Sequence, residues 1–192
     1  DQAGTHKITN CWYAGQLTTP GYYAGGIVGY LETANLTIDN CLFTGTVIST
    51  TTDEMGAYAG GILGRAAGSA TLKLKSCLGD GTVKAKATTR IGMLIGASRC
   101  NVEYVATYAT GDISNVDNKI INFAYGMNPG VGTYSNNEGP VWVGAAVAKT
   151  ASDIAGINAY KYTDLGFYST SNTSGKWVAR DGKSPALKSF VA

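Results

Sequence analysis

The sequence predicts an all-β protein, a right-handed parallel β-helix (solenoid) of about four coils with a C-terminal capping region. Two repeated blocks support this prediction. A block with an internal cysteine occurs at Ile8–Gly15 and returns at Ile38–Gly45 and Leu74–Gly81. Between these copies lies a glycine block, at Gly25–Gly29 and Gly60–Gly64 and, more loosely, at Gly92–Gly96. Such self-similarity is typical of solenoids, in which each repeat packs on its neighbours.

The spacing of the repeats indicates about one coil per unit. The glycines that close the first block are Gly15, Gly45, Gly81 and Gly111, so successive steps are 30, 36 and 30 residues. In the fourth unit, Thr107 takes the place of the cysteine. The longer step contains a polar insertion around Ser49–Gly56. An insertion confined to one segment of a repeat behaves as a surface loop.

Within each unit the pattern is that of short strands joined at corners. Leu36-Thr37-Ile38 alternates apolar and polar residues, as expected for a half-buried strand. The alternation changes phase after Asp39-Asn40, so we expect a corner there, with Asn10 at the equivalent place in the first unit. Asparagine tolerates the left-handed backbone of a corner, and stacked amides can bond between coils. A β-sandwich of hairpins would explain the strands, but not why whole units match.

The two ends of the repeat lead to two further expectations. Repeats fill residues 1–126, and residues 127–192 form a cap within the same structural unit. The apolar cross-section of the last coil is then covered by C-terminal aromatic residues, with a short helix starting near Thr150. These aromatic residues are Trp142, Tyr160, Tyr162, Phe167, Tyr168 and Trp177. At the other end, an upstream domain of the same chain is expected to cover Ile8, Cys11 and Trp12.

Composition excludes several classes of partner. Only 15% of the 192 residues are charged, the formal net charge is +2, and no basic stripe is present, so a nucleic-acid partner is not expected. No apolar run reaches the roughly 18 residues that a membrane-spanning helix needs, so this segment is not expected to cross a membrane. The 26 glycines indicate tight bends and closely approaching backbones.

Three of the four cysteines occupy one column of the repeat. Cys11, Cys41 and Cys77 are separated by 30 and 36 residues, without the paired spacing of a zinc site, and His6 is the only histidine. Residues stacked in parallel point the same way, which suits disulfide geometry poorly. We therefore expect a ladder of buried thiols beside the corners at Asn10 and Asn40, with no metal and no cofactor. Cys100 stands apart, and we expect it to be a free thiol near the surface.

A few side chains suggest binding or catalysis. Asp80 and Asp112, with Lys84 and Lys86 nearby, form the best carboxylate cluster for acid–base chemistry, although most such charges are solvated loop positions. Aromatic residues are numerous for so neutral a chain, and they suit sugar rings or flat protein partners. The aromatic residues that could face a ligand are Trp12, Tyr13, Tyr22, Tyr23 and Tyr58.

The pattern N-C-x-x-x-G-x-V followed by G-G-I-V-G resembles the GLUG repeats of bacterial cell-surface proteins. The first part is matched at Asn40–Val47 and the second at Gly25–Gly29, with leucine in place of valine at Gly60–Gly64, and the resemblance extends over about residues 5–126. Such repeats are common in Bacteroides-type surface proteins and are also found in surface peptidases of the IgA1-protease type. The C-terminal Trp177–Lys188 segment is similar to the close of such proteins. The resemblance supplies no catalytic residue.

Together these features lead us to expect a non-enzymatic module on the outside of a bacterial cell, serving in adhesion, display or spacing. Its partner would be a host or cell-surface protein or a glycan. The alternative is a carbohydrate-active enzyme, a lyase-like or glycosidase-like β-helix that uses Asp80 and Asp112.

Overall fold

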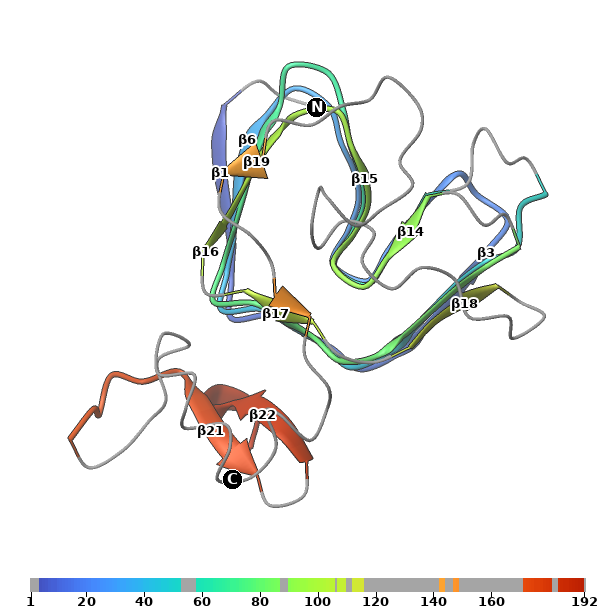
Figure 1. Cartoon of the computed structure of the whole chain (residues 1–192). Helices are drawn as coiled ribbons and strands as arrows, with labels where there is room; N and C mark the ends of the chain where they lie inside the picture. Colours follow the sequence, from blue (N-terminus) through green and yellow to red (C-terminus); the bar gives the residue numbers. More distant parts are fainter. Residues whose placement is uncertain are drawn as a thin grey trace.

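The computed structural model of the chain is a stack of parallel β-strands, which confirms the predicted all-β solenoid (Figure 1). It describes residues 4–52, 58–86, 90–105, 107–109, 112–115, 142–143, 147–148, 171–180 and 183–191. Across these residues the stacked strands form five parallel sheets, which we name A to E. No helix in this part of the chain is long and apolar enough to cross a membrane.

Each sheet collects equivalent strands from successive coils. Sheet A contains β1 (Thr5–Thr9), β6 (Asn35–Asp39), β11 (Thr71–Lys75), β16 (Asn101–Val105) and β19 (Trp142–Val143). Sheet B contains β2 (Trp12–Tyr13), β7 (Leu42–Phe43), β12 (Leu78–Gly79), β17 (Tyr108–Ala109) and β20 (Val147–Ala148). Sheet C contains β3 (Gln16–Thr19), β8 (Thr46–Ser49), β13 (Thr82–Ala85) and β18 (Asp112–Asn115). Sheet D contains β4 (Tyr23–Gly25), β9 (Tyr58–Gly60) and β14 (Ile91–Gly92). Sheet E contains β5 (Val28–Leu31), β10 (Leu63–Ala66) and β15 (Ile95–Ser98).

The path of one coil is seen along the stack in Figure 1. The chain runs from sheet A through sheet B to sheet C, then turns back through sheets D and E before the next coil begins. Successive coils are in register: Thr5 pairs with Asn35, and Asn35 pairs with Thr71. The register also continues on both sides of the insertion, because Ser49 pairs with Ala85 and Tyr58 pairs with Tyr23. The matching units of the sequence are therefore matching layers of the fold.

The corner between sheets A and B has the conformation that the sequence predicts. Asn10, Asn40 and Ser76 have φ values of 54°, 51° and 50°, in the left-handed region. This turn lets Ile38 and Cys41, three positions apart, both face the core with no exposed surface. Backbone amides continue the ladder through the corner, since Asn10 N–H donates to Asp39 O at 3.1 Å and Asn40 N–H to Lys75 O at 2.9 Å.

Parallel stacking extends further along the chain than the recognisable repeats. Strand β19 pairs with β16 and strand β20 pairs with β17, both in parallel. Trp142, one of the aromatic residues assigned to the cap, thus lies on a strand of sheet A. Backbone hydrogen bonds can continue a ladder where the side-chain motif has been lost, because every residue except proline supplies the same donor and acceptor.

A C-terminal hairpin packs on the side of the solenoid. Its antiparallel strands β21 (Trp177–Arg180) and β22 (Lys183–Leu187) are followed by the 3-10 helix η3 (Lys188–Phe190). Trp177 is fully buried against Leu42 and Leu78, which lie on sheet B in the second and third coils. The prediction that Trp177 covers the open end of the last coil is therefore wrong. Tyr160, Tyr162, Phe167, Tyr168 and the helix expected near Thr150 lie outside the described residues.

The hairpin explains why both faces of sheet B are apolar. Cys41 and Phe43 point into the core, whereas Leu42, between them, belongs to the cluster around Trp177. Trp12 joins this outer cluster, and its ring meets Phe190 edge-on at 5.7 Å. An outward column of Trp12, Leu42 and Leu78 would be a large exposed apolar patch without a cover. The hairpin removes that patch from water.

Candidate binding site

The three column cysteines lie one above another at the corner between sheets A and B. All four cysteines are free thiols, and Cys41 and Cys77 are fully buried. The Cys77 thiol donates to Lys75 O at 3.2 Å and to Ile38 O of the preceding coil at 3.4 Å. Thr107 stands in the same place, and its hydroxyl donates to Val105 O at 3.0 Å and to Leu74 O at 3.1 Å. The column is thus a set of small donors that tie each corner to the coil before it.

Two thiols of this column have raised pKa values, whereas a hydrogen bond from the Cys77 thiol lowers the pKa of Cys41, which lies between them. Burial raises the pKa of Cys11, and it raises the pKa of Cys77 well above the ordinary thiol value. An unfolded thiol loses its proton near pH 8.5, while these folded thiols keep theirs. The stability they contribute is therefore complete below about pH 8.5 and is lost as the pH rises toward their raised pKa values.

We expect the free energy of unfolding to fall above pH 8.5, by up to about 1.4 kcal/mol per pH unit for each thiol that stays protonated in the fold. Urea unfolding between pH 7 and pH 10 measures this slope. The Cys77→Ala variant removes one titrating group and should show a smaller slope. Equal slopes in the two proteins would contradict a role for the Cys77 proton.

Cys100 departs from its prediction. It is a free thiol, as expected, but only 4% of its surface is exposed, so the expected place near the surface is wrong. It lies just after β15, where the Ser98 hydroxyl is 3.3 Å from its sulfur and accepts from its backbone N–H at 3.2 Å. Its neighbour Arg99 is exposed. Burial raises the pKa of Cys100 as well.

The predicted carboxylate cluster is spread along sheet C. Asp112 begins β18 and pairs with Thr82, two residues beyond Asp80, while Lys84 pairs with Ser114. Asp80 and Lys84 are half-buried and Lys86 is exposed; the side chain of Asp112 lies outside the described part of the chain. Among the described residues, no group of three or more His, Cys, Asp or Glu side chains is arranged to hold a metal ion.

The aromatic residues predicted to face a ligand fall into two groups. Trp12 and Tyr13 belong to the packing of the solenoid: Trp12 Nε1–H donates to Thr44 Oγ1 at 2.7 Å under the hairpin, and Tyr13 stacks on Phe43 at 6.0 Å. Tyr22 and Tyr23 are 53% and 38% exposed, among the most exposed large apolar side chains of the described residues. Tyr58, by contrast, is only 4% exposed. The second group, Tyr22, Tyr23 and Tyr58, lies along sheet D.

Sheets D and E meet at a seam in which residues pair across the two sheets. In the first coil, Tyr23 on β4 stacks on Tyr30 of β5, with ring centroids 4.4 Å apart and planes at 11°. In the second coil, Tyr58 on β9 faces Arg65 of β10, whose guanidinium carbon lies 4.4 Å from the ring centroid. The two pairs lie one above the other in successive coils. In the strand register, Tyr23 is paired with Tyr58 and Tyr30 is paired with Arg65. We name these four residues with Tyr22 the tyrosine–arginine seam.

Arg65 holds the rings of the seam in place. Its Nη1 donates to the Tyr23 hydroxyl at 3.4 Å, and its guanidinium lies about 6 Å from the Tyr23 and Tyr30 rings as well. A cation over a tyrosine face contributes about 0.5–2 kcal/mol, more as water is excluded. Arg90 approaches the other side of the seam, 4.8 Å from the Tyr58 ring. The exposed residues Tyr22 and Tyr23 therefore lie at one end of the seam, and the buried residues Tyr58 and Arg90 lie at the other.

The surroundings of the seam raise the pKa of one of its phenols, Tyr30. Burial, followed by the nearby Glu32 carboxylate, raises the pKa of Tyr30 above its ordinary value. At neutral pH the Tyr30 hydroxyl therefore keeps its proton and can donate a hydrogen bond. Hydroxyl donors beside exposed ring faces, with one guanidinium behind them, are the groups that hold sugars and other flat polar ligands.

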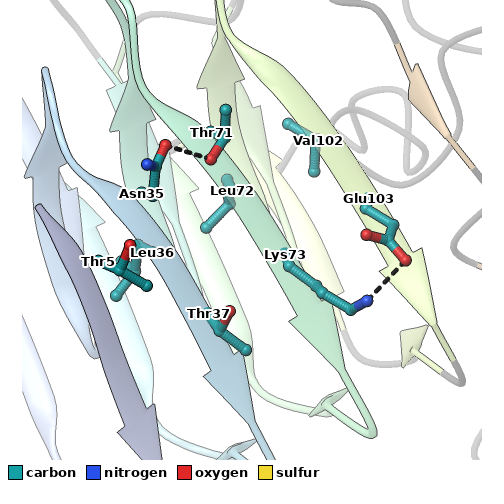
Figure 2. A pocket seen from close by; sticks show the side chains of 9 residues that line it. All are labelled: Thr5, Asn35, Leu36, Thr37, Thr71, Leu72, Lys73, Val102 and Glu103. Atoms are coloured by element: carbon teal, nitrogen blue, oxygen red, sulfur yellow. Dashed lines mark hydrogen bonds and ion pairs between the residues drawn. The ribbon is translucent and has the colours of Figure 1, made fainter.

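Two hollows lie elsewhere on the surface. One, of about 320 Å³, lies on sheet A, where polar groups meet each other across the coils (Figure 2). Thr71 Oγ1–H donates to Asn35 Oδ1 at 2.6 Å, and Lys73 forms an ion pair with Glu103 at 2.7 Å. The other, of about 270 Å³, lies between Asn10 and the hairpin and is lined by Lys176 and Lys188. In the first hollow these four polar side chains are paired with one another, and neither hollow is lined by an aromatic residue.

Sequence reasoning missed two residues of this arrangement. Arg65 and Arg90 were not distinguished from other residues, because their partners lie on another sheet or another coil. Tyr30 is one of the numerous aromatic residues, but its stacking on Tyr23 was not predicted. The available signal was the repeat alignment, which places an aromatic residue or an arginine in front of or behind the glycine block in three successive coils. No protein-family model matches the chain, and neither a curated protein nor a solved structure is similar enough to show a relationship.

Proposed function

We propose that this chain is a non-enzymatic repeat module of a bacterial cell surface that binds a glycan through the exposed end of the tyrosine–arginine seam. The surface setting rests on the resemblance to GLUG repeats at the cysteine and glycine blocks. The binding role rests on one observation, two adjacent exposed tyrosines, Tyr22 and Tyr23, of which Tyr23 is held by Tyr30 and Arg65.

Tyr22 and Tyr23 are exposed although nothing in the packing of the fold requires it. Most of the large apolar side chains in the described residues are buried, so two adjacent exposed tyrosines are a feature of the surface that packing does not require. The Tyr22 and Tyr23 ring centroids are 6.4 Å apart with planes at 60°, so their faces are not used on each other. A sugar presents a C–H face to a ring and hydroxyls to its edge, which suits tyrosine better than phenylalanine.

The scaffold adds pre-organisation. Tyr23 is fixed by stacking on Tyr30 and by the Arg65 hydrogen bond, so little side-chain freedom is lost when a ligand binds. Rigid aromatic residues lower the entropic cost of association. Because the chain carries few charged residues, the binding energy must come from stacking and hydroxyl contacts. This favours a neutral or weakly charged glycan over a strongly charged partner.

The full chain should bind one or more glycans on an array, and the double variant Tyr22→Ala/Tyr23→Ala should bind them about 5- to 150-fold more weakly. The expected loss follows from about 0.5–1.5 kcal/mol for each aromatic contact, with 1.4 kcal/mol equal to a factor of ten. Isothermal titration of the strongest glycan from the array measures it. Tyr23→Phe keeps the ring but removes the hydroxyl that accepts from Arg65, and should weaken binding less.

The matched control is Phe190→Ala. Phe190 is 48% exposed, close to the 53% of Tyr22, but lies on the C-terminal hairpin away from sheets D and E. Its loss should leave glycan affinity unchanged. Binding that survives loss of both tyrosines would move the ligand away from the seam, and turnover of a polysaccharide that Asp112→Asn abolishes would replace the binding module by the enzyme alternative.

A further inference from the structure

The face of the solenoid at the first coil is incompletely covered. Strands β1 to β5 each stand at the edge of their sheet, so one side of each ladder has no strand partner in the described chain. Six inward side chains of this coil are only partly buried, whereas their equivalents in the second coil are fully buried. The partly buried set is Ile8, Cys11, Tyr13, Leu17, Ile27 and Val28, and the buried set is Ile38, Cys41, Phe43, Val47, Ile62 and Leu63.

The glycines Gly15, Gly45 and Gly81 form a column, and a position of this column has to be glycine where a preceding coil covers it. A Cβ atom added to Gly81 would collide with the carbonyl oxygen of Gly45, and one added to Gly45 would collide with the carbonyl oxygen of Gly15. Glycine is therefore required at both positions by the coil before. Gly15 has the same place in the first coil, yet within the described residues its Cβ would meet only the Tyr13 ring, at an ordinary 3.6 Å. The first coil keeps a glycine that nothing described requires.

The thiol column shows the same feature. The Cys41 thiol lies 3.9 Å from Ile8 O and the Cys77 thiol 3.4 Å from Ile38 O, each carbonyl belonging to the preceding coil. Each thiol also donates to the carbonyl two residues earlier in its own coil. Cys11 makes this local bond, to Thr9 O at 3.5 Å, but no described coil precedes it to offer the second carbonyl.

We infer that the first-coil face is a docking surface for one more coil of this same repeat, stacked in parallel and in register before β1. Such a coil would bring a glycine carbonyl over Gly15, a strand carbonyl over Cys11 and strands to the edges of all five sheets. Glycan chains and globular proteins with no exposed strands present no such column of carbonyls, whereas a parallel coil does so at the strand spacing of about 4.8 Å. The interface would continue the one already formed between the first and second coils.

An extended chain tests this inference. A copy of residues 5–34 placed before Thr5 supplies a coil in register, because Thr5 pairs with Asn35 and the copy therefore ends where the next coil begins. The copy carries serine at its cysteine position, so that the half-buried Cys11 stays identifiable. N-ethylmaleimide labelling with peptide mapping should modify Cys11 in the original chain and lose that modification in the extended chain. Cys11 that stays as reactive after extension would overturn the inference.

Alanine at the glycine column gives an independent readout. In the original chain, Gly15→Ala should leave the melting temperature unchanged, while Gly45→Ala should lower it. In the extended chain, Gly15→Ala should lower the melting temperature as Gly45→Ala does. A loss from Gly15→Ala in the original chain equal to that from Gly45→Ala would contradict the inference. If Cys11 in the original chain becomes protected from N-ethylmaleimide as the protein concentration rises, a second copy of the chain is the occupant. That result would also overturn the inference.

Discussion

Replacing Phe43 by alanine should lower the free energy of unfolding by about 3–5 kcal/mol, as for other fully buried aromatic residues. Phe43 has no exposed surface and stacks on Tyr13 at 6.0 Å. Its ring fills the space left by glycines of both repeat blocks: a Cβ on Gly26 would lie 3.0 Å from the ring, and one on Gly81 would lie 2.5 Å from it. Truncation would therefore open a cavity bounded by backbone, which cannot easily collapse. Urea unfolding followed by circular dichroism measures the loss.

Phe190→Ala serves as the comparison, since it removes the same side chain from a half-exposed position in edge-on contact with Trp12, and an aromatic pair contributes about 0.5–1.5 kcal/mol. A Phe43→Ala loss below about 1 kcal/mol would show that the coils repack around the missing ring, contrary to the close backbone approach described above.

If the hairpin and the solenoid unfold together, replacing Trp177 by alanine should lower the free energy of unfolding by about 3–5 kcal/mol. If they unfold separately, the substitution should detach the hairpin from the solenoid. Trp177 is fully buried and is the largest residue of the cluster that joins the hairpin to Leu42 and Leu78. Hydrogen exchange separates the two results. We expect faster exchange throughout Trp177–Leu187 and, if the hairpin detaches alone, unchanged protection of β6 and β11.

Protection of the hairpin that is unchanged by Trp177→Ala would contradict this account of its docking. Leu78→Ala is the companion variant on the solenoid side. It should loosen the same hairpin amides, because Leu78 belongs to the outer cluster, whereas Leu74→Ala removes a leucine of the inner core and should act on the whole stack.

The sequence was sufficient to predict the parallel stack, the corner and the core-facing columns. All three depend on local pattern repeated at regular intervals: the phase change at Asn40, the return of the cysteine, and the glycine blocks. Each of these features can be recognised within a single repeat, and it then recurs in every other repeat. The left-handed φ of Ser76 shows that the corner persists even where asparagine is replaced.

What the sequence did not predict depends on contacts between distant segments. Leu42 and Leu78 have the parity of outward residues, and only the hairpin explains their burial, with Trp177 lying 135 residues after Leu42 and 99 after Leu78. Tyr23 was expected to face a ligand, but its pairing with Tyr30 and Arg65 appears only when sheets D and E are folded against each other. Likewise Cys100 lies in an exposed-looking context beside Arg99, yet the turn after β15 points it inward.

Ligand-observed NMR tests most directly whether the seam binds a glycan without transforming it, as we propose. A glycan selected on the array is mixed with the full chain, the aromatic protons of the protein are saturated, and the sugar spectrum is followed for a day. We predict saturation transfer to the sugar C–H protons that disappears in Tyr22→Ala/Tyr23→Ala and persists in Phe190→Ala, with the glycan unchanged throughout. New anomeric or unsaturated-sugar signals, or transfer that persists without the two tyrosines, would contradict the claim.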